Sequence, residues 1–348
     1  MKKVLKMFLV GLLIFSFAAG NSLVYGQESN NAVISDKDLV ISKLLNAGWS
    51  MQQINDLPDS ELMTYKDGQV VSHDTRYYRL SSQKKEVEVA DEKTKKKKTV
   101  LVPIEGTSKT TELSEEQCMA EVQLWNESHN ELQNSNDIST MSSSVSNINL
   151  TPMSYDNGNA SSTDADGWIK VDIYATYISG SKYKLTGFWT WLTTPGYRLT
   201  DVFGLGHDSG LIHTNDAVFA YYSASRKYYV GWDSESPAYY DTYYTESYSN
   251  LAVDDGGDCV SFNLMDDTNL GANDSYYTSH RGGMSYYVNV NGTATRYTMV
   301  YGKYAHQKWA WNVSPSISWP LSVGFSVSPS SYFDYLSPNP YFQLHVNY

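Results

Sequence analysis

Apolar and polar residues alternate in short runs along the C-terminal half of the chain, from Gly167 onward. A period of two is the pattern of a β-strand whose two faces meet different environments. Turn residues separate the runs, and Asn291-Gly292 is the clearest tight hairpin among them. The expected fold is mainly β, an antiparallel β-sandwich or jelly-roll. Its strands are predicted over residues 168–178, 182–192, 198–205, 211–224, 226–232, 259–265, 284–291, 293–305, 315–328 and 341–348.

A helical pattern precedes these strands, in residues 36–66. Four apolar residues recur there near helical spacing before the run stops at Gly48: Leu39, Ile41, Leu44 and Leu45. Ser50 and Gln53 form a capping box, so a second short helix is expected to begin there. Asp59, which follows Pro58, is expected to cap a third short helix.

The segment L-L-N-A-G-W-S-x-x-x-I-N-D-L-P, residues 44–58, combines a helix end, a Gly-aromatic turn, a short helix and a Leu-Pro turn. It resembles the N-terminal segments of uncharacterised secreted proteins of Gram-positive spore-forming bacteria. The resemblance is confined to this helical segment, and it implies nothing about activity or ligand.

Apolar runs at residues 86–90 and 99–104 flank a lysine-rich turn and predict a β-hairpin. The lysines of that turn either contact an anionic wall polymer or lie solvated at the hairpin tip. A second capping box, Ser114 with Gln117, opens a helix that runs to about residue 128. The chain then becomes rich in Ser and Asn, with too few large apolar side chains to offset the entropy of ordering. The expected division is a small α+β region at 27–128, a linker at 129–165 and the β-sandwich at 166–348.

The first 26 residues have the pattern of a secretory signal peptide. Three lysines precede an apolar run at residues 7–19, and small residues permit cleavage after Gly20 or Gly26. The run is too short for a membrane span, and no later stretch is apolar for long enough to be a transmembrane segment. The mature protein is therefore expected outside the cell, either released or associated with the cell wall.

Charge narrows the class of partner. The formal net charge is −12, and loss of the three signal-peptide lysines would make it −15. A strongly acidic protein repels phosphate backbones, so nucleic acid is excluded as the natural partner. Between Lys227 and Arg281 the chain carries ten acidic residues and no lysine or arginine.

Aromatic residues are concentrated in the predicted sandwich, which holds 24 of the 29 tyrosines. The acidic window contains Trp232 and a dense tyrosine cluster, Tyr239, Tyr240, Tyr243 and Tyr244. We interpret this window as a long loop, the kind of segment on which binding sites of β-scaffolds usually lie. Its rings either bind sugars or cationic groups, or cover the edge of the sheet.

Two Trp-x-Trp pairs provide the second set of candidate binding residues, Trp189 with Trp191 and Trp309 with Trp311. Residues two apart on a strand share a face, so each pair forms a strip of two rings. Strips that face outward would form a stacking platform for sugar rings. Strips that face inward would belong to the core.

Oxygen-rich acidic runs make calcium the metal to consider, with candidate ligands Asp254, Asp255, Asp258, Asp266 and Asp267. None of the runs keeps the twelve-residue calcium-loop pattern, so no cofactor is assigned. The chain has only two cysteines, Cys118 and Cys259. In an exported protein they either form a disulfide or remain two thiols, one on a helix and one on a strand.

No catalytic signature such as G-x-S-x-G is present, and no catalytic residue is assigned. The favoured hypothesis is a secreted extracellular protein that binds a glycan or the cell surface through aromatic residues. One alternative is a polysaccharide hydrolase, because paired acids cannot be recognised from sequence order. The other is a membrane-active β-protein, because residues 341–348 alternate like the closing strand of a barrel.

Overall fold

The computed structural model describes thirteen stretches of the chain: residues 35–90, 97–104, 106–134, 163–214, 216–229, 238–246, 249–254, 256–267, 275–292, 297–308, 316–318, 326–328 and 330–346. The predicted signal peptide and most of the predicted linker lie outside the described residues. From Asp36 onward the chain forms one compact unit.

Nine strands form the larger sheet, in the order β2-β1-β4-β5-β12-β8-β9, with β3 added beside β1 and β7 beside β12. All of its pairings are antiparallel. The strands are β1 (Gln69–Ala90), β2 (Lys97–Pro103), β3 (Lys109–Leu113), β4 (Thr163–Ser179), β5 (Lys182–Trp191), β7 (Leu211–His213), β8 (Phe219–Tyr229), β9 (Ala238–Thr245) and β12 (Ser275–Val290).

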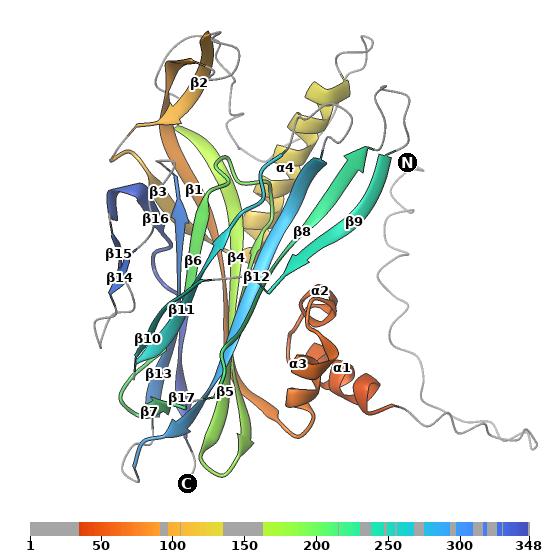
Figure 1. The fold of residues 1–348 in the computed structure, drawn as a ribbon, viewed down its shortest axis with the longest axis vertical. Coiled ribbons are helices and arrows are strands. Elements are labelled where there is room, and N and C mark those ends of the chain that lie inside the picture. The colour runs from red at the N-terminus through yellow and green to blue at the C-terminus, as the bar shows by residue number, and fades with distance from the viewer. Residues whose placement is uncertain are drawn as a thin grey trace, which may run out of the picture. The chain divides into compact units, whose positions relative to one another are not determined.

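A six-stranded sheet packs against it, in the order β10-β11-β6-β13-β16, with β17 added beside β13. Its strands are β6 (Thr200–His207), β10 (Ser249–Asp254), β11 (Gly257–Asn263), β13 (Tyr297–Gln307), β16 (Phe333–Tyr335) and β17 (Tyr341–His345). A separate pair is formed by β14 (Ser316–Ser318) and β15 (Ser326–Ser328). The predicted mainly β, antiparallel architecture is therefore confirmed (Figure 1).

The main core lies between the two sheets. Leu185, Trp189 and Trp191 of β5 contribute to it from the larger sheet, and Phe203 and Tyr304 contribute from the smaller one. Burial along β5 is almost continuous instead of alternating. Both faces of this strand are covered, which removes the contrast that produces alternation.

Helices cover the face of the larger sheet that points away from the core, which we call the outer face. They are α1 (Asp36–Asn46), α2 (Met51–Asn55), α3 (Asp59–Leu62), the 3-10 turn η1 (Met63–Tyr65) and α4 (Glu115–Asn134). Both predicted capping boxes are formed, at Ser50 and at Ser114. Asp59 is the first residue of α3 instead of its cap, and Pro58 holds the cap position.

The segment from α1 to η1 is fixed to the outer face by apolar packing and by buried polar bonds. Its Trp49 packs in one cluster with Tyr174 of β4, Phe188 of β5 and Tyr221 of β8. Two buried ion pairs add to this contact: Asp56 with Arg281 at 2.5 Å, and Glu61 with Lys184 at 2.6 Å. Because this segment covers Tyr221, both members of the pair Tyr221-Tyr222 are buried.

The second helical element, α4, packs over β1 and β4. Cys118 and Val122 of α4 share a hydrophobic cluster with Tyr77 of β1 and Trp168 of β4. The Trp168 indole N–H donates to the Glu121 carboxylate at 2.7 Å. Among the helices of the described stretches, none has the length and apolar character needed to cross a membrane.

Candidate functional site

The tyrosine cluster lies on a strand, which corrects the prediction of a long loop. Residues 238–245 form β9, which pairs with β8 from Tyr222↔Thr245 to Tyr229↔Ala238. The acidic residue inside this strand, Asp241, is neutralised by an ion pair with Arg226 of β8. Arg226 precedes the stretch between Lys227 and Arg281 that has no lysine or arginine. The charge pattern of that stretch alone therefore predicted a solvated loop incorrectly.

Cross-strand register places three side chains in one row on the outer face. Lys227 of β8 lies opposite Tyr276 of β12 and also opposite Tyr240 of β9. Directly opposed residues in an antiparallel sheet share a face. Tyr240 is 74% exposed and Tyr276 is 39% exposed. The Lys227 ammonium lies 5.9 Å from the centre of the Tyr240 ring.

Tyr244 extends this surface along the same face of β9. It is two-fifths exposed and stacks on the buried ring of Tyr221 with 5.7 Å between ring centres. We call Tyr240, Lys227, Tyr276 and Tyr244 the tyrosine face. The Tyr244 ring is thus supported from below by the cluster that also holds the α1–η1 segment.

The two remaining tyrosines of the cluster point to the other side of the sheet. Tyr243 packs against the main core and meets Tyr277 edge to face, with ring centres 6.0 Å apart. Tyr239 stacks on Tyr228 at 5.5 Å, and the Arg226 guanidinium covers Tyr228. Structure therefore divides the four predicted tyrosines between the two faces of one strand.

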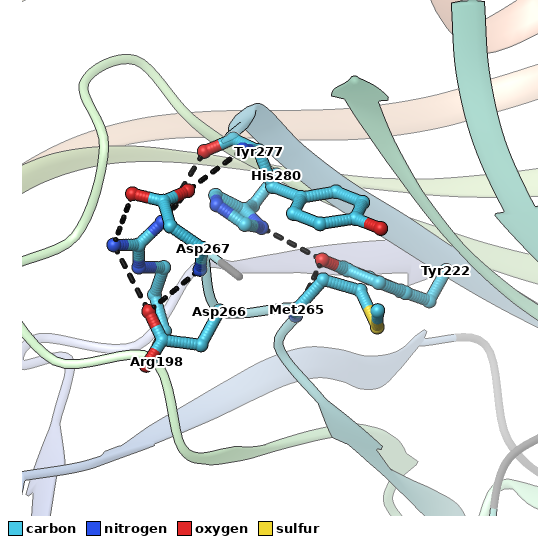
Figure 2. Close-up of polar contacts among 7 residues, drawn as sticks. All are labelled: Arg198, Tyr222, Met265, Asp266, Asp267, Tyr277 and His280. Atoms are coloured by element: carbon cyan, nitrogen blue, oxygen red, sulfur yellow. Dashed lines mark hydrogen bonds and ion pairs between the residues drawn. The ribbon is translucent and has the colours of Figure 1, made fainter. Parts of the chain in front are cut away.

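A polar cluster contacts β12 at Tyr277, next to Tyr276 of the tyrosine face (Figure 2). Arg198, from the connection between β5 and β6, forms a two-pronged contact with Asp267, at 2.7 and 2.9 Å. The same Asp267 accepts the backbone N–H of Tyr277 at 2.9 Å. The second carboxylate, Asp266, lies 3.0 Å from Arg198. These bonds tie the segment after β11 to β12.

Figure 2 also shows a hydrogen-bond chain through Tyr222, which lies on the core side of β8. The backbone N–H of Met265 donates to the Tyr222 hydroxyl at 3.0 Å. That hydroxyl lies 2.7 Å from Nδ1 of His280. Since Tyr222 already accepts one hydrogen bond, its own proton is free to be donated to a neutral imidazole.

His280 occupies an irregular position in β12. The pairing of β12 with β8 shifts between Thr278 and Arg281, and Ser279 adopts φ = 53°. This is the left-handed region, which costs energy for a residue other than glycine. Burial, aided by the positive charge of Arg198, lowers the pKa of His280 to about 4. The imidazole is therefore neutral at physiological pH.

Trp189 and Trp191 share one face of β5, as predicted, and that face is the core. Trp189 stacks on Tyr222, and both indoles are almost completely buried. The Trp191 N–H donates to the Tyr304 hydroxyl at 2.8 Å and to Asp201 at 3.2 Å. Neither ring can serve as an exposed stacking platform. The other predicted tryptophans, Trp232, Trp309 and Trp311, lie outside the described residues.

Asp201 is the centre of a second buried polar network. It accepts from Nδ1 of His306 at 2.6 Å and from the Tyr304 hydroxyl. Burial disfavours the charged imidazole of His306, but the adjacent Asp201 carboxylate outweighs this effect and raises the pKa of His306. The network is enclosed between the sheets, so it stabilises the core and is not open to a ligand.

The calcium candidates whose side chains the structure describes are engaged in other contacts. Asp258 is buried, and its carboxylate accepts the backbone N–H of Cys259 at 2.9 Å. Asp266 and Asp267 are engaged by Arg198, Asp255 lies outside the described residues, and the Asp254 side chain is likewise not described. Within the described stretches, no three His, Cys, Asp or Glu side chains are grouped so as to hold a metal ion.

Of the two alternatives for Cys118 and Cys259, the disulfide is not formed. Cys118 packs in the α4 cluster and Cys259 in a separate cluster with Val202 and Phe333, and both are buried thiols. Burial, together with the nearby carboxylates of Glu121 and Glu115, raises the pKa of the Cys118 thiol to about 12. The alternative of one thiol on a helix and one on a strand is therefore the correct one.

Three residues of the site were not singled out from the sequence: Tyr276, Lys227 and His280. The predicted strands leave out residues 266–283, so Tyr276 was not assigned to a strand, and only the pairing of β12 with β8 places it beside Lys227. No protein-family model matches this chain, and no curated protein matches its sequence.

Proposed function

We propose that the tyrosine face binds carbohydrate and that the protein is a glycan-binding protein that acts outside the cell. The row Tyr276–Lys227–Tyr240 carries this proposal. A sugar ring presents an apolar C–H face, which packs well on an exposed phenol ring. The Lys227 ammonium and the tyrosine hydroxyl groups beside the rings supply hydrogen bonds to sugar hydroxyls.

Preorganisation supports the same proposal. Tyr244 rests on buried Tyr221, and β12 is tied to its neighbours by Arg198, Asp267 and His280. Rings that are held in place before the ligand arrives lose less entropy on binding. Exposed apolar patches on a folded protein often mark binding sites, and the tyrosine face is such a patch.

The extracellular location rests on the signal-peptide pattern of residues 1–26. Expression of the full chain in a Gram-positive host should release protein that begins at residue 21 or residue 27. N-terminal sequencing of protein from the medium tests this. Full-length protein retained in the cell would contradict it.

Retention on insoluble glycans tests the binding proposal. The mature protein should sediment with at least one of peptidoglycan, chitin, cellulose and xylan, and Tyr240→Ala should reduce retention. Tyr297→Ala is the matched control, because Tyr297 is a tyrosine of β13 in the other sheet and is 56% exposed. Lack of retention on every glycan, or equal losses in the two variants, would overturn the proposal.

A further inference from the structure

Strand β9 ends the nine-stranded sheet. It is the last strand in the sheet order, and within the described stretches it pairs with β8 alone. A terminal strand presents a row of backbone N–H and C=O groups along its second edge. Another extended segment can extend the sheet by pairing with these groups.

Natural proteins usually protect such an edge, and the two edges of this sheet differ in protection. The opposite edge is formed by β2 and β3, with the sequences KKTVLVP and KTTEL, which together carry three lysines and a proline. Strand β9 has the sequence AYYDTYYT, with no lysine and no proline. Tyrosine and threonine favour strands, and the single acid Asp241 is already neutralised by Arg226.

We propose that β9 pairs in antiparallel fashion with β9 of a second copy of this chain, about a two-fold axis through Thr242. A two-fold axis perpendicular to the sheet keeps the same face outward in both copies. Directly opposed residues share a face, so each residue of β9 pairs with a residue of the partner whose number differs from its own by an even number or by zero. Centring the pair on Thr242 places Tyr240 opposite the partner's Tyr244. It also places Asp241 opposite the partner's Tyr243.

Neighbouring registers are less favourable. An axis through Asp241 would oppose two carboxylates directly, which is destabilising in a sheet. An axis through Tyr243 would place Tyr240 opposite the partner's Glu246 and would leave Tyr239 without a partner residue inside β9. Only the Thr242 axis combines full overlap of residues 239–245 with two cross-strand tyrosine pairs.

The consequence is a sheet that continues through the dimer, with the two tyrosine faces joined at the axis. Tyr240 of each copy would lie beside the partner's Tyr244 on the same outer face. This interface does not rest on carbohydrate binding, since it follows from the edge position and the sequence of β9. A small interface of this kind gives a concentration-dependent dimer.

Sedimentation equilibrium of the mature protein tests the proposal, with Thr242→Lys as the disrupting variant. Two lysines opposed on the axis should weaken dimerisation about ten-fold or more. Thr278→Lys is the matched control, because both threonines are exposed and both lie opposite Ser225, but Thr278 belongs to the interior strand β12. It should dimerise like the wild type.

A cross-linking experiment covers the case in which Thr242→Lys fails to fold. Directly opposed residues of an antiparallel pair lie within disulfide range, so Thr242→Cys should form a covalent dimer on mild oxidation. Thr278→Cys should remain a monomer on a denaturing, non-reducing gel. A wild-type protein that stays monomeric at its highest soluble concentration, or equal cross-linking of the two variants, would overturn the proposal.

Discussion

The imidazole of His280 should make the folded state less stable as the pH is lowered. Burial and the charge of Arg198 lower the pKa of this group in the folded protein from 6.5 to about 4. The unfolded chain therefore takes up the proton first as the pH falls. The contribution of His280 to stability is fully present above pH 6.5 and is lost as the pH falls toward 4.

The difference between 6.5 and about 4 corresponds to about 3 kcal/mol in the free energy of unfolding. Most of it, about 2.5 kcal/mol, should be lost between pH 7 and about pH 4.5. Burial opposes ionisation of Asp267, but hydrogen bonds from Arg198 and from the Tyr277 N–H outweigh it, so the pKa of this carboxyl is lowered. Its stabilising effect is lost only below about pH 3.8, outside the chosen range.

Urea unfolding at the two pH values, for the wild type and for His280→Asn, measures this contribution. Asparagine keeps a polar atom near the Tyr222 hydroxyl but cannot bind a proton at these pH values. The wild type should lose about 2.5 kcal/mol more than the variant on acidification. Other titrating groups are common to both proteins and cancel. Equal losses in the two proteins would refute the assignment of a buried, neutral His280.

Two further predictions concern the core. Asp56→Asn should lower the free energy of unfolding by about 3–5 kcal/mol, because it leaves the buried guanidinium of Arg281 without its carboxylate partner. Asp59→Asn, which breaks an exposed ion pair, should cost less than about 1 kcal/mol, and equal costs in urea unfolding would contradict the buried contact. Cys118 and Cys259 should be unreactive toward a thiol reagent in the folded protein, and both should react after denaturation without reductant. Absence of reaction after denaturation would show a disulfide.

The features that local sequence determines were predictable. The capping boxes at Ser50 and Ser114 use only residues three apart, and both form. The apolar runs located several strands of the sandwich, among them β4 and β5, but left β9 and β10 unassigned. The mainly β fold class follows from such local signals.

The site depends on contacts between distant residues, and these could not be read from the chain. The acidic residues around the tyrosine cluster favoured a loop. The pairing of Asp241 with a residue of the neighbouring strand, which neutralises its charge, cannot be seen in the sequence. Trp189 and Trp191 were known to share a face, but which face meets the second sheet depends on how the sheets pack. Likewise, the burial of Tyr221 depends on a helical segment more than 150 residues earlier, which contributes Trp49 to the same cluster.

Carbohydrate binding by the tyrosine face is the central claim, and a dissociation constant measured for each ring tests it most directly. On a soluble fragment of whichever glycan retains the protein, Tyr240→Ala and Tyr276→Ala should each weaken binding about five-fold. This corresponds to about 1 kcal/mol for the ring area that a sugar would cover. The double variant should lose binding further, whereas Tyr297→Ala should bind like the wild type. Unchanged affinity in the double variant would contradict the account.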